Sequence, residues 1–130
     1  MLDVVMDTNV LVSALLAPES KPAKILALAL NGKILLHYDS RILLEYENVL
    51  NRPKFRFDPA DVSALMEVII QIGAAVSAEP RAEAFTDEAD KKFYETAKSS
   101  GALLITGNLK HFPQEPGIVS PAEFLIANLI

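Results

Sequence analysis

The chain has 130 residues, 51% of them hydrophobic, and this length and apolar content suit one compact domain with a single core over residues 1–130. It contains no cysteine, which excludes disulfides, thiolate metal sites and a cysteine nucleophile. Its formal net charge of -5 argues against binding of nucleic acid through a uniformly basic surface, but it leaves open an acidic cleft in which bound cations reverse the local charge.

The N-terminal half predicts strands and helices in alternation. Residues 2–6 are typical of a short core strand, and the apolar pattern over 8–17 predicts a helix that ends at Pro18, so the chain begins as strand, acidic turn and helix. Periodicity, caps and prolines predict the remaining elements of this half: a helix from Ser20 through Leu30, a strand over 34–38, and a helix over 41–50 capped by Asp39-Ser40.

The C-terminal half continues the alternation. The same signals predict, in order, a helix from Asp58 to about Ile72, a strand over 75–78, a helix from about Ala89 to Ser99, a strand over 102–106, an edge strand over 118–119, and a last helix that opens with a capping box at Ser120 and Glu123. Strands that alternate with helices predict an α/β fold with a mainly parallel central sheet and helices on both faces. Because the apolar stretches stop short of a membrane-spanning length, we expect a soluble, cytoplasmic protein with no membrane partner.

Polar side chains gather directly after the predicted strands, where parallel sheets bind ligands. Asp7 follows the first strand, Asp39 and Ser40 follow the second, and Thr106-Gly107-Asn108 follows the fourth. Acidic residues also stand near the starts of two predicted helices: Glu45, Asp87 and Asp90. We expect the fold to bring these positions together at one edge of the sheet.

A cluster of carboxylates needs a counter-charge. Unit charges about 4 Å apart repel by roughly 4 kcal/mol at an intermediate effective dielectric. Carboxylate and amide oxygens, with no cysteine and only two histidines in the chain, favour Mg²⁺ or Mn²⁺ over zinc or copper. A hard cation held in this way can acidify a water and stabilise charge on phosphorus, so the residues favour phosphodiester hydrolysis.

Four segments resemble the PIN-domain family, in the family's order and over nearly the whole chain. They are Met6-Asp7-Thr8-Asn9-Val10, Glu45 to Leu50 with Arg52-Pro53-Lys54-Phe55, Asp90 with Phe93 and Ala97, and Thr106-Gly107-Asn108-Leu109-Lys110-His111-Phe112. The branch that the chain resembles most contains toxin components of prokaryotic toxin-antitoxin pairs. The resemblance implies metal-dependent endonucleolytic cleavage of single-stranded RNA and an antitoxin protein as partner.

The resemblance also implies which residues form the site. Asp7, Glu45 and Asp90 match the family's metal-binding carboxylates and are the expected catalytic residues. Asn108 stands where many members carry Asp, and His111 stands where another acid is common. Asn108 can still bind a metal through its carbonyl or position a water, so we include it in the catalytic and metal-binding set, although one negative charge fewer weakens a second metal.

Several of these residues also have structural interpretations. Asp7 could serve only as the N-cap of the first helix, and Glu45 competes with Glu47 on the same helix. We favour Glu45 because it lies nearer the capped end, while Leu43, Leu44 and Leu50 mark much of the buried side. Four further residues are expected to support the site through hydrogen bonds or helix caps: Thr8, Asn9, Asp87 and Thr106.

Basic and aromatic residues offer contacts to RNA. They alternate over 52–57, a pattern typical of stacking on single-stranded RNA or else of a helix end with core aromatics. Three lysines flank the predicted cleft and are candidates for phosphate contacts: Lys91, Lys92 and Lys110. We assign no metal role to His37 or His111, which are too far apart in sequence to form a local metal motif.

Two other functions remain open from the sequence. The first is a catalytically weak RNA-binding or protein-binding module, in which Asn108 and His111 mark a partly degenerate acidic site. The second is a phosphotransfer or phosphatase domain with Asp7 as nucleophile, which ranks last because Thr106 is followed by Gly rather than by a suitably placed Lys. Three apolar segments are candidates for a homodimer or antitoxin surface, or else for the core: 11–16, 26–30 and 124–130.

Overall fold

Five strands form one sheet in the computed structural model, which describes residues 1–128. In chain order they are β1 (Leu2–Met6), β2 (Ile34–Tyr38), β3 (Ala74–Ala75), β4 (Leu103–Ile105) and β5 (Ile118–Val119). Across the sheet their order is β3-β2-β1-β4-β5, and every pairing is parallel. The predicted α/β fold with a mainly parallel central sheet is therefore confirmed.

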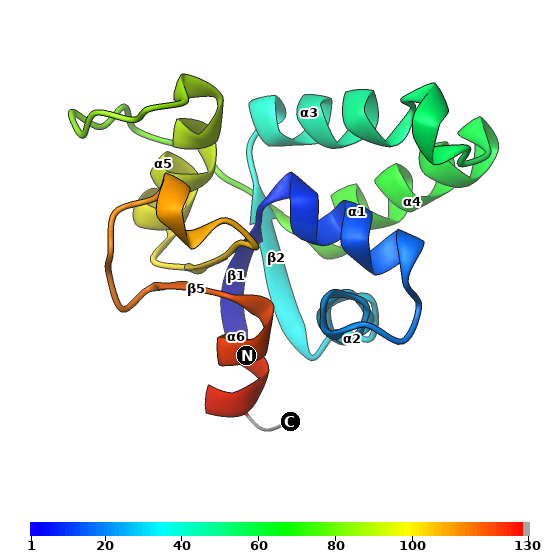
Figure 1. The fold of residues 1–130 in the computed structure, drawn as a ribbon, viewed down its shortest axis with the longest axis horizontal. Coiled ribbons are helices and arrows are strands. Elements are labelled where there is room, and N and C mark those ends of the chain that lie inside the picture. Colours follow the sequence, from blue (N-terminus) through cyan, green and yellow to red (C-terminus); the bar gives the residue numbers. More distant parts are fainter. Residues whose placement is uncertain (129–130) are drawn as a thin grey trace.

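Helices lie on both sides of the central strands, as predicted. In the described part of the chain they are α1 (Thr8–Leu16), α2 (Lys21–Leu30), α3 (Ser40–Leu50), α4 (Pro59–Ile72), α5 (Lys91–Ser100) and α6 (Pro121–Ala127). Figure 1 shows α5 on one side of β1 and β2, with α1 and α2 on the other. Short 3₁₀ helices occur at three further places: η1 (Pro53–Phe55), η2 (Glu88–Asp90) and η3 (Leu109–His111). None of the helices within residues 1–128 is long and apolar enough to cross a membrane.

Helix starts follow the predicted caps. The side chains of Ser20 and Asp39 accept hydrogen bonds of 3.2 and 2.9 Å from backbone amides three residues further on. Ser120 and Glu123 form the reciprocal capping box of α6. These caps satisfy backbone donors that a helix leaves unpaired at its N-terminus, so the local sequence sets where each helix begins.

Strand β3 is shorter and earlier than predicted. The sequence indicated a strand over 75–78, whereas β3 is confined to Ala74–Ala75. A Cβ atom at Gly73 would lie 2.7 Å from the carbonyl oxygen of Leu36, so only a glycine lets the chain approach β2 this closely. Pairing with β2 therefore starts directly after the glycine.

The core lies around β1, whose last three residues are fully buried. On α3 the buried side chains are Ile42, Tyr46 and Leu50, which recur every four residues and share one face of the helix. Leu44, which the sequence placed on the buried side, is 61% exposed because it lies halfway between two members of that series. Of the three leucines predicted on the buried side of α3, Leu50 is buried and Leu43 is half-buried, so the prediction is wrong for Leu44.

The apolar segments considered as partner surfaces contribute much of the core. In the first two, the exposed large hydrophobic side chains are Leu16 and Leu30, which end their helices. In the third, Phe124 is fully buried and Ile126 is 72% exposed, while residues 129–130 lie outside the described residues. Among the described residues of these segments, large apolar side chains free for a partner therefore lie at or near helix ends.

The carboxyl ends of β1, β4 and β5 meet at one edge of the sheet. Met6 is in register with Ile105, and Ile105 is in register with Val119. The amide of Asp7 donates to the carbonyl of Ile105 at 2.9 Å, and the amide of Thr106 donates to the carbonyl of Val119 at 3.0 Å. Parallel pairing therefore sets the first polar residues after β1 and β4 side by side.

Candidate active site

Asp7 is buried at the carboxyl end of β1, with 5% of its surface exposed. It occupies the N-cap position of α1, but its side chain makes no capping hydrogen bond. Instead its carboxylate accepts a 2.7 Å hydrogen bond from the Thr106 hydroxyl, whose oxygen accepts one from the Asn108 amide at 3.0 Å. A capping role therefore does not account for the Asp7 carboxylate.

Glu45 lies on α3 beside the start of α1. One of its carboxylate oxygens accepts a hydrogen bond from the Thr8 hydroxyl, and the other pairs with the Lys92 ammonium at 2.6 Å. The phenol of Tyr46 donates a 2.5 Å hydrogen bond to the carbonyl of Met6 and so ties α3 to the end of β1. Glu47, the competing residue in the sequence, is exposed.

Asp90 is the last residue of η2, directly before α5. Its carboxylate lies 3.1 Å from Nδ1 of His111 on η3. Asp87 caps η2 by accepting a 3.0 Å hydrogen bond from the Ala89 amide, whereas Asp90 makes no side-chain cap at the start of α5. Asp87 thus has the structural role considered for it, and the carboxylate of Asp90 is bound only by a side chain.

The acidic residues meet in one cavity of about 390 Å³, which we call the acidic cavity. Its lining comes from the end of β1 and from α1, α3, η1 and η2: Asp7, Thr8, Asn9, Val12, Ser13, Glu45, Val49, Arg52, Phe55, Asp87, Ala89 and Asp90. The predicted site residues that do not line it are Thr106, which is fully buried and bound to Asp7, and Asn108. Asn108 is exposed and lines a separate pocket of about 270 Å³, shared with Asn9 and Gly107.

Negative charge in the acidic cavity is only partly compensated. Burial raises the pKa of Asp7 from 3.8 to about 6, and the charges of Asp90 and Glu45 add to the rise, while the hydrogen bond from Thr106 opposes it. Burial and the charge of Asp87 also raise the pKa of Asp90. Ionised carboxylates at this position are thus held in an unfavourable environment.

The donor chemistry of the cavity suits a hard divalent cation. Asp7, Glu45 and Asp90 supply carboxylate oxygens, the ligands that Mg²⁺ and Mn²⁺ prefer. Within residues 1–128, however, no three acidic or histidine side chains are arranged to hold a metal ion directly. Two of the three carboxylates contact protein partners instead: Glu45 contacts Lys92 and Asp90 contacts His111.

Asp39 is not part of this cluster, although the sequence placed it at the same edge of the sheet. It caps α3 and pairs with Arg41 at 2.7 Å, and Arg41 also pairs with Glu95 at 2.8 Å. Its charge is therefore matched locally by an arginine, and it does not line the acidic cavity.

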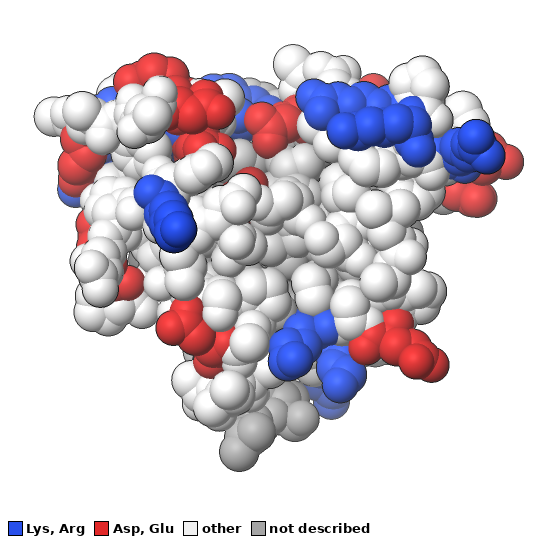
Figure 2. Space-filling model, viewed as in Figure 1, with Lys and Arg blue, Asp and Glu red and all other residues white. Residues whose placement is uncertain are grey.

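Basic and aromatic side chains border the acidic cavity. Arg52 and Phe55 line it, and the ring of Phe55 stacks on Phe57 with centroids 5.8 Å apart. The Lys54 ammonium lies 5.0 Å from the Phe55 centroid. Figure 2 shows basic atoms at the upper right, over the end of α3 and the segment after it, and acidic atoms at the upper left. Both rings are half-buried, so each packs partly against the protein and leaves part of its surface free for stacking.

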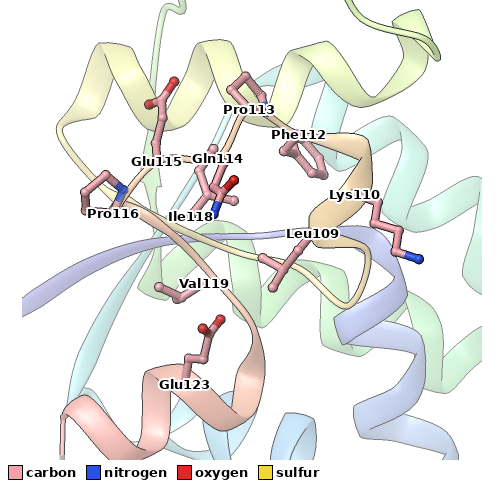
Figure 3. A pocket seen from close by; sticks show the side chains of 10 residues that line it. All are labelled: Leu109, Lys110, Phe112, Pro113, Gln114, Glu115, Pro116, Ile118, Val119 and Glu123. Carbon is pink, nitrogen blue, oxygen red and sulfur yellow. The ribbon is translucent and has the colours of Figure 1, made fainter.

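A larger cavity of about 770 Å³ lies between η3 and β5 (Figure 3). It is lined by Lys110 but by none of the predicted acidic site residues. Its own carboxylates are already engaged, because Glu115 accepts a 2.7 Å hydrogen bond from the Tyr94 hydroxyl and Glu123 belongs to the capping box of α6. Although this cavity is larger than the acidic cavity, its carboxylates already have protein partners, and we do not take it as the functional site.

Sequence reasoning missed the contact between Lys92 and Glu45, since it considered this lysine only for phosphate. One signal could have found it. Lys91 and Lys92 occupy the first turn of α5, where the helix dipole disfavours positive charge. A lysine at such a position indicates an anionic partner nearby.

Comparisons with known proteins agree with this geometry. Residues 3–110 match the family described as the PIN domain. The uncharacterized protein MJ1680 of Methanocaldococcus jannaschii is 32% identical over 108 residues, which cover 81% of this chain and 70% of that protein.

Two solved structures share the fold. The crystal structure of PAE2754 from Pyrobaculum aerophilum has a TM-score of 0.63 at 17% identity and covers 97% of this chain and 88% of its own. The structure of VapBC2 from Rickettsia felis, bound to a DNA fragment from their promoter, has a TM-score of 0.62 at 14% identity and covers 92% and 97%. The family match over residues 3–110, together with the 32% identical relative, establishes that the chain belongs to the PIN-domain family.

Proposed function

We propose that the chain is a metal-dependent endoribonuclease that hydrolyses phosphodiester bonds of single-stranded RNA in the acidic cavity. The observation that carries this proposal is the meeting of three carboxylates, Asp7, Glu45 and Asp90, from three separate elements in one cavity. Asp7 is buried without a cationic partner among the described residues, beside two further carboxylates, and such a grouping is typical of an active site.

In this proposal the three carboxylates hold Mg²⁺ or Mn²⁺. When bound, such a cation supplies an acidified water and stabilises negative charge on the phosphate. Thr106 fixes the orientation of the Asp7 carboxylate through its 2.7 Å hydrogen bond, and Thr8 fixes Glu45. Asn108 is proposed as a weaker catalytic or metal-binding group, and because it lines the neighbouring pocket rather than the acidic cavity, we favour one metal over two.

Single-stranded RNA suits the border of the cavity. Proteins bind single strands by stacking bases on aromatic rings and by attracting the backbone with basic side chains. Phe55 offers a half-buried ring at the cavity, with Arg52 beside it and Lys54 over the ring. A duplex offers no exposed base faces for such a ring, so the segment favours a single strand.

We further propose that the protein is the toxin of a toxin-antitoxin pair and acts in the cytoplasm, with an antitoxin or a second copy of the chain as partner. The similarity of fold to VapBC2 supports the class. Exposed Leu44 and Ile70, on α3 and α4, offer apolar area to a protein partner.

Cleavage of a long single-stranded RNA by purified protein tests the proposal. The reactions contain Mg²⁺, Mn²⁺ or chelator, and Asp7→Ala purified identically controls for contaminating ribonuclease. Cutting by the wild type alone, and only with metal, supports the proposal. Absence of cutting by folded protein in either metal contradicts it.

One observation favours a second function, a catalytically weak module that binds RNA or a protein. Glu45 and Asp90 are paired with Lys92 and His111, and Asn108 lies outside the acidic cavity. RNA binding that survives Asp7→Ala, without any cleavage, is the result that this alternative predicts.

A further inference from the structure

Lys92 contacts Glu45, one of the carboxylates that line the acidic cavity. Its ammonium group lies 2.6 Å from a Glu45 oxygen, and it also donates a hydrogen bond to the carbonyl of Ala89, which lines the acidic cavity. The same group lies 5.1 Å from the ring centroid of Phe93. Only 12% of the side chain is exposed, so several neighbours fix the ammonium at this place.

The adjacent lysine is held differently. Lys91 and Lys92 both line a groove of about 720 Å³ that Glu45 also borders. The charge of Lys91 helps to lower the pKa of Glu95, whereas among the described ion pairs it is Lys92 that contacts Glu45. The two lysines lie in the same turn of α5, and each carries one positive charge. Contact with Glu45 is therefore a property of Lys92, not of basic residues at the start of α5 in general.

Glu45 is fully engaged by this arrangement. One carboxylate oxygen accepts from Thr8 and the other is paired with Lys92, so a cation in the cavity must share or replace the Lys92 contact to use that oxygen. Asp7 has no comparable cationic partner among the described residues, because its carboxylate accepts a hydrogen bond from the neutral hydroxyl of Thr106. The ammonium thus neutralises the rim of the cluster and leaves the buried centre negative.

We propose that Lys92 is a resident counter-ion that competes with the divalent cation for Glu45 and sets the metal affinity of the site. This inference rests on the proposed metal-binding function of the cavity. In the metal-free protein Lys92 stabilises the fold by balancing Glu45. In the metal-bound protein the same positive charge opposes the ion, so the lysine raises the metal concentration at which the site fills.

Titration calorimetry with Mn²⁺ alone, on the folded protein, tests the proposal. We expect Lys92→Met to bind Mn²⁺ at least about tenfold more tightly than the wild type, the change expected from removing a unit charge within a few ångströms of the ion. Lys91→Met removes the same charge one residue away and is expected to change the affinity by less than about twofold, because solvent screens more distant charges. Thermal unfolding in chelator is expected to show that Lys92→Met lowers the stability of the metal-free protein.

A double-mutant cycle separates competition for Glu45 from a general charge effect. In a Glu45→Gln background the lysine has no carboxylate to pair with. Adding Lys92→Met to that background is therefore expected to raise the Mn²⁺ affinity by much less than about tenfold. Lys92→Arg keeps the charge and is expected to bind Mn²⁺ as the wild type does. If Lys92→Met does not fold, Lys92→Gln replaces it, since this shorter polar side chain suits a partly exposed position.

The outcomes also separate this inference from the proposed function. Unchanged or weaker Mn²⁺ binding by Lys92→Met, with Asp7-dependent binding in the wild type, overturns the inference alone. Absence of Mn²⁺ binding in every variant overturns both. Tighter binding by Lys92→Met in a protein that cuts no RNA supports the inference and contradicts the nuclease.

Discussion

Replacing Asp7 by asparagine is expected to stabilise the metal-free protein near neutral pH. The amide has the shape of the carboxylate and can accept the same hydrogen bond from Thr106, so the substitution removes charge and little else. What it removes is a buried negative charge beside Glu45 and Asp90.

The magnitude follows from the pKa of Asp7, which rises from 3.8 to about 6 in the folded protein. About two pKa units at about 1.4 kcal/mol each make ionised Asp7 cost roughly 3 kcal/mol of folding free energy. Because the folded pKa is the higher one, the folded protein binds this proton more tightly, and stability falls as the pH rises from about 4 to about 6. Below that window both states are protonated and the cost vanishes, while above it the cost is present in full.

Urea unfolding of both proteins in metal-free buffer, at several pH values from 4 to 8, measures this difference. We expect Asp7→Asn to exceed the wild type by about 3 kcal/mol at pH 8 and by close to zero at pH 4. Saturating Mn²⁺ should then stabilise the wild type selectively, by about 2.7 kcal/mol at a hundredfold excess over the dissociation constant. An Asp7→Asn protein that is less stable at pH 8, or a difference that does not change with pH, would refute the reasoning.

Three further predictions concern the site and the sheet. Glu45→Gln is expected to lower metal-dependent RNA cleavage by about a hundredfold or more, whereas Glu47→Gln on the exposed side of α3 leaves it within about twofold, as measured by initial cleavage rates. Phe55→Ala is expected to weaken binding of a single-stranded oligonucleotide by about 1–3 kcal/mol in fluorescence anisotropy, with Mn²⁺ affinity unchanged. Gly73→Ala is expected to destabilise the fold by about 2 kcal/mol or more in urea, because its Cβ would lie 2.7 Å from the Leu36 carbonyl oxygen; a neutral result would show that β3 can shift away from β2.

Elements of the fold that depend on local chemistry could be predicted from the sequence. Ser20, Asp39 and Ser120 bind amides within three residues of themselves, so their helices begin close to where the caps indicated. The extent of β3 could not be predicted in this way, because it depends on how closely Gly73 approaches Leu36, far away in the sequence.

The candidate site also has a part that the sequence predicts and a part that it does not. Parallel strands end at one edge, so the sequence order of strands was enough to bring Asp7 toward Thr106. Glu45 and Asp90, which the family resemblance indicated, line one cavity with Asp7, although the predicted buried side of α3 was only partly right. Side-chain orientation was not available to such reasoning. Asn108 stands two residues beyond Thr106 and yet lines a different pocket, because its backbone amide, rather than its side chain, turns toward the Thr106 hydroxyl.

The distribution of partners in the acidic cavity argues for a role of Asp7 beyond folding. The two outer carboxylates each contact a basic or ionisable side chain, Lys92 or His111, while the most buried one accepts a hydrogen bond from the neutral hydroxyl of Thr106 and has no such partner among the described residues. An amide at position 7 could accept that hydrogen bond without the cost of a buried charge, so the carboxylate adds nothing to stability that asparagine would not. A residue that is expected to destabilise the metal-free protein, at the point where three elements converge, is explained best by what its charge binds.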